Sequence, residues 1–404
     1  MDVVCVGGGP AGLYFAILTK LRDPASKVTV LERDPAGVTY GWGVTYSDDV
    51  LDSLYQGDPV SAAQIHRSPA SWHDQLVRLG DRPVAHLGGY GFAIGRHRLL
   101  DLLANRAIAL GARIRYENPV EDPADLAEFA GTDLILAADG ANSRLRRWHA
   151  PEFGTEVEQG GNYYIWLGTS KVFREFSYVF EPTDAGWVWC YAYPFDGHTT
   201  TFIAECSPET WCRLGFADLG PEQTRQALER IFARHLEGHP LLLQTKIQDF
   251  DAPWLRFSWV TNHTWCHRNI ALAGDAAHTT HFSIGNGTKL ALDDVLELDR
   301  QLGLHADVPA ALEDYQARRI AAVADRQRVA RNSAAWFEQL DHYTHLDQER
   351  FSFALRTRGQ GGVVPASGLP WLLHRATQFS VGRGARGVLS SARRRQRTRS
   401  ARSQ

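Results

Sequence analysis

The first 32 residues constrain the fold of this chain more than any other stretch. An apolar run at residues 2–6 leads directly into a glycine-rich turn, and an apolar helical pattern then precedes a second apolar run at residues 28–31. This order predicts a β-strand, an α-helix and a parallel β-strand. The turn has the spacing G-x-G-x-x-G, formed by Gly7, Gly9 and Gly12, and Glu32 closes the second run.

Such a unit suits a dinucleotide. The glycines let the backbone approach a pyrophosphate at the helix N-terminus, and an acid at the end of the second strand can accept a hydrogen bond from a ribose hydroxyl. We therefore predict a dinucleotide site at residues 7–32. The alternative is a glycine-rich turn in a doubly wound fold that binds no ligand.

A second glycine-rich stretch, at residues 270–287, has the features of a ligand-binding turn. A buried strand over residues 270–273 ends at Gly274, where a residue without a Cβ atom can turn the chain. Asp275 then offers an acceptor to a ribityl hydroxyl, while Gly285 and Gly287 open a helix whose N-terminus favours an anion. The alternative is a structural connection with Asp275 as an N-cap.

Length and composition indicate a globular protein. The 404 residues, 44% of them hydrophobic, allow two structural domains or one domain with a large insertion. Five scattered cysteines without ligand spacing predict reduced thiols and no metal site. No leader peptide and no run long enough to span a membrane are expected, so we predict a cytoplasmic protein without membrane contact.

The charge is distributed unevenly along the chain. Eight arginines follow residue 382, and taking their charges from the formal net charge of −3 leaves −11 for the rest. A basic end of this kind can touch nucleic acid, membrane or an anionic substrate. We expect instead a disordered, solvated tail and no nucleic-acid partner.

The middle of the chain changes character twice. Residues 40–95 are expected to be loop-rich. A helix begins at Arg96 with arginines in its first turn, which indicates an anion nearby; a solvated arginine is the alternative. Further strands are predicted at 112–116 and at 134–138, before Asp139. From residue 162 to about 259, alternating aromatic and β-branched residues predict an antiparallel sheet.

The predicted organisation follows from these changes. A nucleotide-binding domain spans residues 1–161 and 266–340, and a β-rich substrate domain is inserted at 162–265. Residues 341–381 are expected to be irregular or helical, and 382–404 form the tail.

Three motifs occur in one fixed order: Gly7-x-Gly-x-x-Gly12 with Glu32, Asp139-Gly-x-x-Ser-x-x-Arg146, and Gly274-Asp-Ala-Ala-His278 leading to Gly285-x-Gly287. Together they resemble the single-component FAD-dependent aromatic hydroxylases of the p-hydroxybenzoate hydroxylase type. The resemblance implies an α/β, Rossmann-like FAD-binding fold with an inserted antiparallel β-sheet substrate domain and C-terminal helices. It also implies that Gly7, Gly9, Gly12 and Glu32 hold the ADP part of FAD, that Arg96 and Asp139 lie along the cofactor, and that Asp275 meets the ribityl chain.

Within that family, residues 41–44, 164–170, 201–207 and 281–289 are similar to a branch of salicylyl-CoA 5-hydroxylases, anthraniloyl-CoA monooxygenases and the tryptophan-derivative hydroxylase of violacein synthesis. The chain departs from the wider pattern at Phe282, where a proline is usual, and at Lys289, where an asparagine is usual.

The resemblance implies a monooxygenase that uses NADH, or NADPH, and O2 to hydroxylate an electron-rich aromatic acyl-CoA. Salicyloyl-CoA, hydroxylated at carbon 5 to gentisyl-CoA, is the substrate we expect. The alternatives are 2-aminobenzoyl-CoA, an indole or tryptophan derivative, and an aryl group tethered to a carrier protein. The oligomeric state is left open.

Aromatic residues of the predicted insertion are candidates for a substrate pocket over the flavin. Because alternate residues of a strand face opposite sides, about half of them should lie elsewhere. The candidates are Tyr163, Tyr164, Trp166, Trp189, Tyr191, Phe282 and Ser283. His281 is the candidate catalytic residue, able to bind or deprotonate a substrate hydroxyl, and a structural histidine is the alternative at this position. His278 is expected to be structural.

Two other classes of protein share parts of this pattern. Trp187-Val-Trp189 is similar to the WxWxIP motif of flavin halogenases, but Pro194 comes two residues too late and no isoleucine precedes it. A non-catalytic FAD-binding protein is the other alternative. NADH oxidation that rises with an aryl compound would exclude it.

Overall fold

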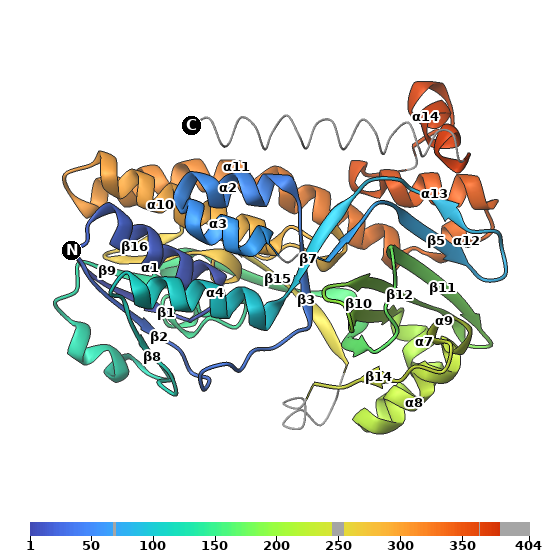
Figure 1. Ribbon diagram of the computed structural model, residues 1–404, viewed down its shortest axis with the longest axis horizontal. Coiled ribbons are helices and arrows are strands. Elements are labelled where there is room, and N and C mark those ends of the chain that lie inside the picture. The colour runs from blue at the N-terminus through green and yellow to red at the C-terminus, as the bar shows by residue number, and fades with distance from the viewer. Residues whose placement is uncertain (68–69, 245–253, 363, 380–404) are drawn as a thin grey trace.

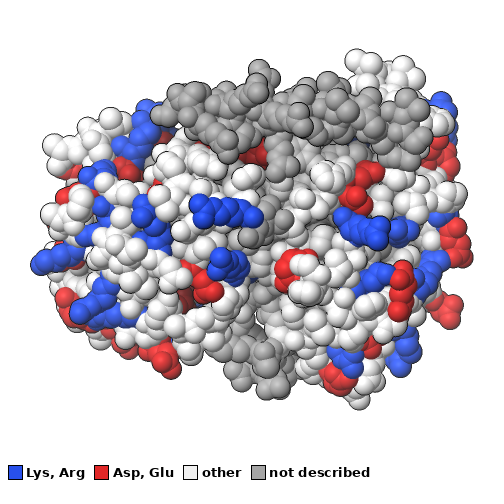
Figure 2. Space-filling view, in the orientation of Figure 1, with Lys and Arg blue, Asp and Glu red and all other residues white. Residues whose placement is uncertain are grey.

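The structure is a computed structural model that describes residues 1–404 except 68–69, 245–253, 363 and 380–404. Figure 1 shows two bodies side by side, one built on a mainly parallel sheet and the other on a mainly antiparallel sheet. Among the described residues, no helix is long and apolar enough to cross a membrane. Acidic and basic side chains lie interspersed over the face seen in Figure 2. The predicted basic tail lies outside the described residues.

The first sheet confirms the predicted βαβ unit. Its strands β1, β2, β8, β9 and β17 run parallel, and β16 pairs antiparallel with β17. In spatial order they are β16 (Cys266–His267), β17 (Ile270–Leu272), β9 (Leu134–Ala137), β1 (Asp2–Val6), β2 (Lys27–Leu31) and β8 (Arg113–Arg115). Because Val6 is in register with both Leu31 and Ala137, the carboxyl ends of three strands meet at one edge.

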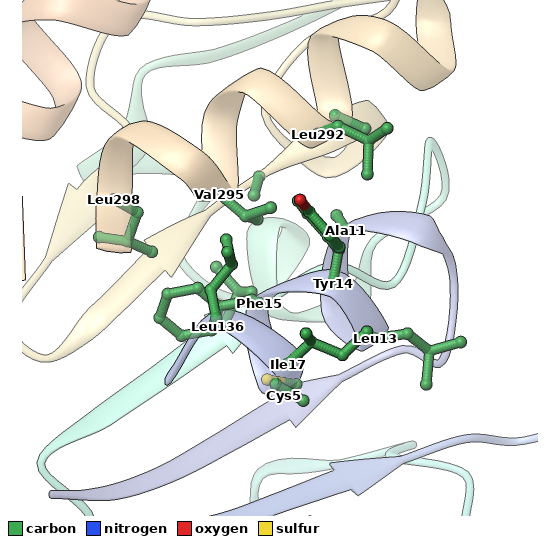
Figure 3. Close-up of a cluster of buried hydrophobic side chains, with 14 of the residues drawn as sticks. Cys5, Ala11, Leu13, Tyr14, Phe15, Ile17, Leu136, Leu292, Val295 and Leu298 are labelled. Atoms are coloured by element: carbon green, nitrogen blue, oxygen red, sulfur yellow. The ribbon is translucent and has the colours of Figure 1, made fainter. Parts of the chain in front are cut away.

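Helices cover this sheet. Figure 3 shows apolar side chains of α1 (Pro10–Arg22) packed between Cys5 and Leu136 of the strands and Leu292, Val295 and Leu298 of α10 (Gly287–Leu304). Residues such as Phe15 and Ile17 are fully buried there, so α1 is fixed in place directly after the glycine turn. Further helices of this body are α2 (Asp48–Gly57), α3 (Pro59–His66), α4 (Arg96–Ala109), α5 (Arg144–Trp148), α6 (Ala150–Phe153), the 3-10 helix η1 (Pro123–Phe129) and the first half of α11 (Val308–Glu338).

The second sheet is antiparallel except where β5 pairs parallel with β11. In order its strands are β14 (Leu241–Leu242), β10 (Thr155–Thr169), β13 (Thr200–Cys206), β12 (Gly186–Pro194), β11 (Phe176–Thr183), β5 (Gln75–Leu79) and β6 (Ala85–His86), with β15 (Leu255–Asn262) paired to β10. One face is covered by α7 (Pro208–Arg213), α8 (Pro221–Ile231), α9 (Ala233–Leu236) and η2 (Phe216–Asp218). The other face turns toward the end of α11 (Val308–Glu338).

The prediction of a loop-rich segment at residues 40–95 is wrong. That segment forms α2, α3, a small sheet of β3 (Gly43–Tyr46), β7 (Gly91–Gly95) and β4 (Ala70–Trp72), and the strands β5 and β6. The buried residues Val50, Leu51 and Leu54 of α2 already have helical spacing in the sequence, and the strands are too short for a clear alternating pattern. Strands β5 and β6 join the second sheet, so this sheet includes residues outside the range 162–265. The domain boundaries remain a prediction.

The described residues between 341 and 379 are largely helical. They form α12 (Asp341–Thr344), α13 (Gln348–Thr357), the 3-10 helix η6 (Arg358–Gln360) and α14 (Gly368–Gln378). Phe351 and Leu355 of α13 are buried with Trp336 and Phe337 of α11. Helix α13 therefore packs against the second sheet and helps to close its inner face.

Candidate functional site

The glycine turn after β1 is shaped by close backbone contacts. Gly7 has a φ of +108°, and a Cβ atom on it would lie 2.3 Å from the carbonyl oxygen of Ala138. A Cβ atom on Gly12 would lie 2.1 Å from the carbonyl oxygen of Gly7, so only glycine lets α1 approach β1 this closely. Gly9, the N-cap of α1, has open space at its Cβ position. The first turn of α1 has no acidic residue and no side-chain cap, so its backbone N–H groups are available to an anion.

A cavity of about 260 Å³ opens at this edge of the sheet. Five of the predicted cofactor-binding residues line it, namely Gly7, Gly9, Glu32, Arg96 and Asp139. Gly12 does not line the cavity but packs against the Gly7 backbone. The Oδ1 atom of Asp139 is buried without a hydrogen-bond partner among the described residues, although Oδ2 accepts from the backbone N–H of Arg144 at 2.8 Å. A glycine cradle beside an unsatisfied buried acceptor fits a bound dinucleotide.

Glu32 is already engaged by the backbone. Its Oε2 accepts from the N–H of Gly8 at 2.7 Å and its Oε1 accepts from the N–H of Asp34 at 2.9 Å. These bonds fix the carboxylate in the cavity wall, and its remaining lone pairs stay open to a ribose hydroxyl.

The buried carboxylate of Asp294 holds the second glycine turn in place. Asp294 of α10 accepts from the N–H of Gly274 at 2.9 Å, pairs with Nε2 of His278 at 2.8 Å and accepts from Nε of Arg319 at 2.8 Å. Burial opposes ionisation of Asp294, but His278, Arg319 and the Gly274 N–H outweigh it and lower its pKa. His278 thus has the structural position expected of it.

Asp275 follows Gly274 in the short 3-10 turn Gly274–Ala276. Its side chain is accessible to solvent, yet it is surrounded by so much protein that lost hydration raises its pKa, against the opposing effect of His278 and Arg96. Arg96 has a pKa lowered by burial, with Asp275 and Glu32 acting in the other direction. An accessible acid deep in the protein is the expected state of a residue that lines a ligand site.

The two remaining glycines of this stretch behave differently. Gly285 has a φ of +64°, and a Cβ atom there would lie 2.9 Å from Oγ1 of Thr45. Gly287 begins α10, with open space at its Cβ position. Gly285 is therefore required by the backbone, whereas Gly287 leaves room beside the helix N-terminus.

The second sheet presents an aromatic wall toward the Asp275 turn. Tyr164 and Tyr191 contact Phe282, with ring centroids 4.8 Å and 5.5 Å apart. Burial raises the pKa of Tyr164 to about 12, and the negative charges of Asp275 and Glu205 add to this effect. Trp166 lies beside Gly41, whose Cβ would be 3.2 Å from the Trp166 ring and 3.4 Å from Cδ of Arg96. Trp166 therefore lies where this wall meets the nucleotide cavity.

Two of the residues predicted for the wall do not line its surface. Tyr163 faces the opposite side of the sheet, where its ring stacks on Trp211 at 4.2 Å and an Arg256 guanidinium lies 5.8 Å from its centroid. This corrects its prediction as a pocket residue, because it alternates with Tyr164 along β10. Trp189 is on the same face of the sheet as Tyr164 and Tyr191, but only 1% of it is exposed and its ring stacks on Phe337. It therefore supports the wall residues from the core.

His281 is buried in this region, with 5% of its surface exposed. Its Nδ1 is 2.9 Å from the Ser283 hydroxyl, which is in turn 2.8 Å from the Ser333 hydroxyl of α11. Burial, aided by the charge of Arg358, lowers the pKa of His281 to about 3. The imidazole is therefore neutral at physiological pH and is a weak base.

Sequence reasoning missed two residues at this site. Glu205 of β13 is 1% exposed and accepts from Tyr191 OH at 2.8 Å, Asn162 Nδ2 at 2.8 Å and Trp189 Nε1 at 3.2 Å. Burial raises its pKa to about 7 despite these bonds. The sequence could have indicated Glu205, because it is the one charged residue within the buried strand β13.

Arg358 is the second missed residue. It donates from Nε to the Ser333 hydroxyl at 2.9 Å, and from Nη2 to the Ser283 carbonyl at 2.7 Å and to Tyr178 OH at 3.2 Å. It fixes the His281–Ser283 segment to α11 and β11. Nothing in the sequence around residue 358 indicates this role.

Comparison with known proteins gives one family and a consistent set of relatives. The FAD binding domain family matches residues 1–330. A salicyloyl-CoA 5-hydroxylase from a Streptomyces species is 36% identical over 95% of this chain and 77% of its own length. A 3-hydroxy-4-methyl-anthranilyl-[aryl-carrier protein] 5-monooxygenase from Streptosporangium sibiricum is 33% identical over 89% of this chain and 94% of its own. Protodeoxyviolaceinate monooxygenase from Chromobacterium violaceum is 29% identical over 87% and 92%.

Solved structures agree on the fold. PqsL from Pseudomonas aeruginosa, in complex with 2-aminobenzoylacetate, superposes with a TM-score of 0.65 at 17% identity, covering 85% of this chain and 98% of its own. The flavin-dependent halogenase CmlS superposes with a TM-score of 0.64 at 14% identity, covering 93% of this chain and 76% of its own. At these identities the likeness concerns the fold alone, which is the predicted Rossmann-like FAD-binding fold with a second, antiparallel sheet.

Proposed function

We propose, from the premise that this chain belongs to the FAD binding domain family and is an FAD-dependent aromatic monooxygenase, that it hydroxylates an electron-rich aromatic acyl thioester. The substrate we propose is salicyloyl-CoA, with hydroxylation at carbon 5 to gentisyl-CoA and NADH as the reductant. Overall, NADH, a proton, O2 and the arene give NAD⁺, water and the phenol.

The observation that carries this proposal is the aromatic wall opposite Asp275. Tyr164 lies in the fields of both Asp275 and Glu205, and its hydroxyl has no hydrogen-bond partner among the described residues. In this proposal a flat, hydroxylated ring lies between this wall and the turn that holds Asp275, where Tyr164 can hydrogen-bond to a ring substituent or to the thioester carbonyl. The ortho hydroxyl of a salicyloyl group directs electrophilic attack to the para carbon, which is carbon 5.

When bound, FAD supplies the activation of O2 and the electrophilic oxygen atom. The chain contributes positioning and exclusion of water. In this proposal Gly7, Gly9, Gly12 and Glu32 hold the ADP part, and Asp275 holds the ribityl chain. Tyr164, Trp166, Tyr191 and Phe282 enclose the ring, with Trp189 behind them.

His281 is the residue that we propose contacts the substrate hydroxyl. With a pKa lowered to about 3, it suits hydrogen bonding in its neutral form better than proton abstraction. Ser283, Ser333 and Arg358 fix the ring by the chain of bonds described above.

If His281 aligns the substrate ring, the variant His281→Ala should still bind FAD but hydroxylate about 10²-fold more slowly or worse. It should also oxidise NADH without forming the hydroxylated product. Product formed per NADH oxidised is the readout, and the FAD absorbance of the purified variant is the control. Wild-type coupling in this variant would exclude His281 from the substrate site.

The substrate is tested with a panel of salicylate, salicyloyl-CoA, 2-aminobenzoyl-CoA and tryptophan. We expect salicyloyl-CoA to stimulate NADH oxidation most and to gain one oxygen atom by mass, whereas salicylate should be a poor substrate. A preference for free salicylate would overturn the thioester assignment. NADPH assayed in parallel decides the reductant.

A carrier-tethered aryl group is a second candidate, favoured by one observation. The alignment covers 94% of the carrier-protein monooxygenase but only 77% of the salicyloyl-CoA 5-hydroxylase, which has additional residues that this chain does not match. The same salicyloyl group presented on CoA and on a carrier protein separates the two candidates by kcat/KM.

A further inference from the structure

A cluster of metal-ligating side chains lies outside the flavin and substrate site. His149 and Glu152 stand three residues apart at the start of the short helix α6, and His267 belongs to β16 at the edge of the first sheet. One ligand atom from each lies within 4.8 Å of the other two. We infer that His149, Glu152 and His267 bind a divalent transition-metal ion, with Zn²⁺ as the representative ion, at the junction between the two sheets.

The distances suit such an ion after small side-chain movements. Two nitrogen or oxygen ligands at about 2.0–2.1 Å from a tetrahedral zinc ion are roughly 3.3 Å apart. Glu152 is exposed and can rotate toward the histidines, which are half-buried. In the described part of the chain, none of the three side chains has a hydrogen bond or ion pair to lose on binding.

Packing holds the two imidazoles in place. The fully buried Phe153 meets both rings edge-on, each at a centroid distance of 6.3 Å, and the rings themselves lie 5.2 Å apart at an angle of 34°. Preorganised rings lose little entropy when they take up a ligand. Imidazole nitrogens favour Zn²⁺, Ni²⁺ or Cu²⁺ over Mg²⁺ or Ca²⁺, which prefer oxygen ligands.

Charge near the cluster acts in both directions. His149 lies in the fields of Glu152 and of Arg268, the residue that follows His267. The carboxylate favours a cation and the guanidinium opposes it, so the inferred site needs the carboxylate as its third ligand. With three protein ligands, water completes the coordination.

The position of the cluster gives the ion a structural task. Phe153 precedes β10, through which the chain enters the second sheet, and its carbonyl oxygen accepts from the N–H groups of His263 and Thr264 at 2.9 Å and 3.1 Å. Those two residues lie where the chain returns from β15 to β16. A metal bound to α6 and β16 would therefore tie together the two crossings between the sheets.

The test is zinc binding by the FAD-loaded, full-length protein. Isothermal titration with Zn²⁺ is expected to show one ion per chain, and the melting temperature should rise by a few degrees at saturating zinc. His267→Ala and Glu152→Gln should each weaken zinc affinity by about tenfold or more, because each removes one of three ligands. Glu152→Gln changes an exposed side chain and should fold normally.

His263→Ala is the matched control. His263 is an exposed histidine 3.4 Å from Glu156, close to the cluster but not part of it, so its loss should leave zinc affinity unchanged. Absence of zinc binding by the wild-type protein, or equal binding by all three variants, would overturn the inference.

Discussion

The buried carboxyl of Glu205 should make the free energy of unfolding depend on pH by a predictable amount. The substitution Glu205→Gln keeps the size of the side chain and can still accept from Tyr191 and Trp189, and a flip of the Asn162 amide can restore the third bond. What it removes is the ionisable group. The wild type and this variant should therefore differ chiefly in how their stability responds to pH.

The magnitude follows from the pKa. Burial raises the pKa of Glu205 from 4.5 to about 7, and the negative charge of Glu338 adds to the shift. Because the folded-state pKa is above the unfolded-state pKa, the unfolded chain loses this proton first as pH rises. Relative to Glu205→Gln, the wild type should lose about 3 kcal/mol in its free energy of unfolding as pH increases from below 4.5 through 7.

The assay is chemical unfolding of the FAD-loaded proteins at pH 5 and pH 8, followed by tryptophan fluorescence. We expect the advantage of the variant in free energy of unfolding to be about 2–3 kcal/mol larger at pH 8 than at pH 5. Glu205→Ala serves as a second comparison, since it leaves three buried donors unpaired and should be destabilised at both pH values, by about 1–3 kcal/mol for each unpaired group. Parallel pH curves for wild type and Glu205→Gln would refute the reasoning.

Three further substitutions test the two glycine turns. Gly12→Ala should cost about 1–3 kcal/mol of stability and reduce FAD content, because its Cβ would meet the Gly7 carbonyl oxygen at 2.1 Å; wild-type stability would contradict the close α1–β1 contact. Gly9→Ala, with open space at its Cβ position, should stay within about 1 kcal/mol of wild type but bind FAD more weakly, as measured by flavin fluorescence. Asp294→Asn should destabilise by about 3–5 kcal/mol in thermal unfolding, since it leaves Arg319 buried without its counter-charge; an unchanged melting temperature would argue against the buried network.

The cofactor side was largely predictable because its geometry is local. Gly7 and Gly12 are five residues apart and their contact is a property of one turn, while Gly274 and Asp275 follow directly from the end of a strand. Periodicity and glycine spacing capture such features without any knowledge of distant partners. Glu32 and Asp139 then follow from the parallel sheet, whose strand ends meet at one edge.

The substrate side was predictable in kind but not in detail. An aromatic strand at residues 163–167 indicates a wall, yet the choice between Tyr163 and Tyr164 depends on which face of β10 is turned inward, and one residue of shift exchanges the faces. Glu205 finds its partners on β10 and β12, and Asn162 is 43 residues away in the chain. His149 and Glu152 acquire His267 only because β16 lies at the edge of the first sheet.

The residues that hold the His281 segment lie beyond the part of the chain that the family matches. The match ends at residue 330, whereas Ser333 and Arg358, which hold Ser283 and the His281 segment, lie beyond it. The glycine turns and Asp275 lie within it. Substitutions at Arg358 should consequently alter substrate turnover and coupling while leaving the FAD content intact, because the Asp294 network that fixes the flavin turn does not depend on this arginine.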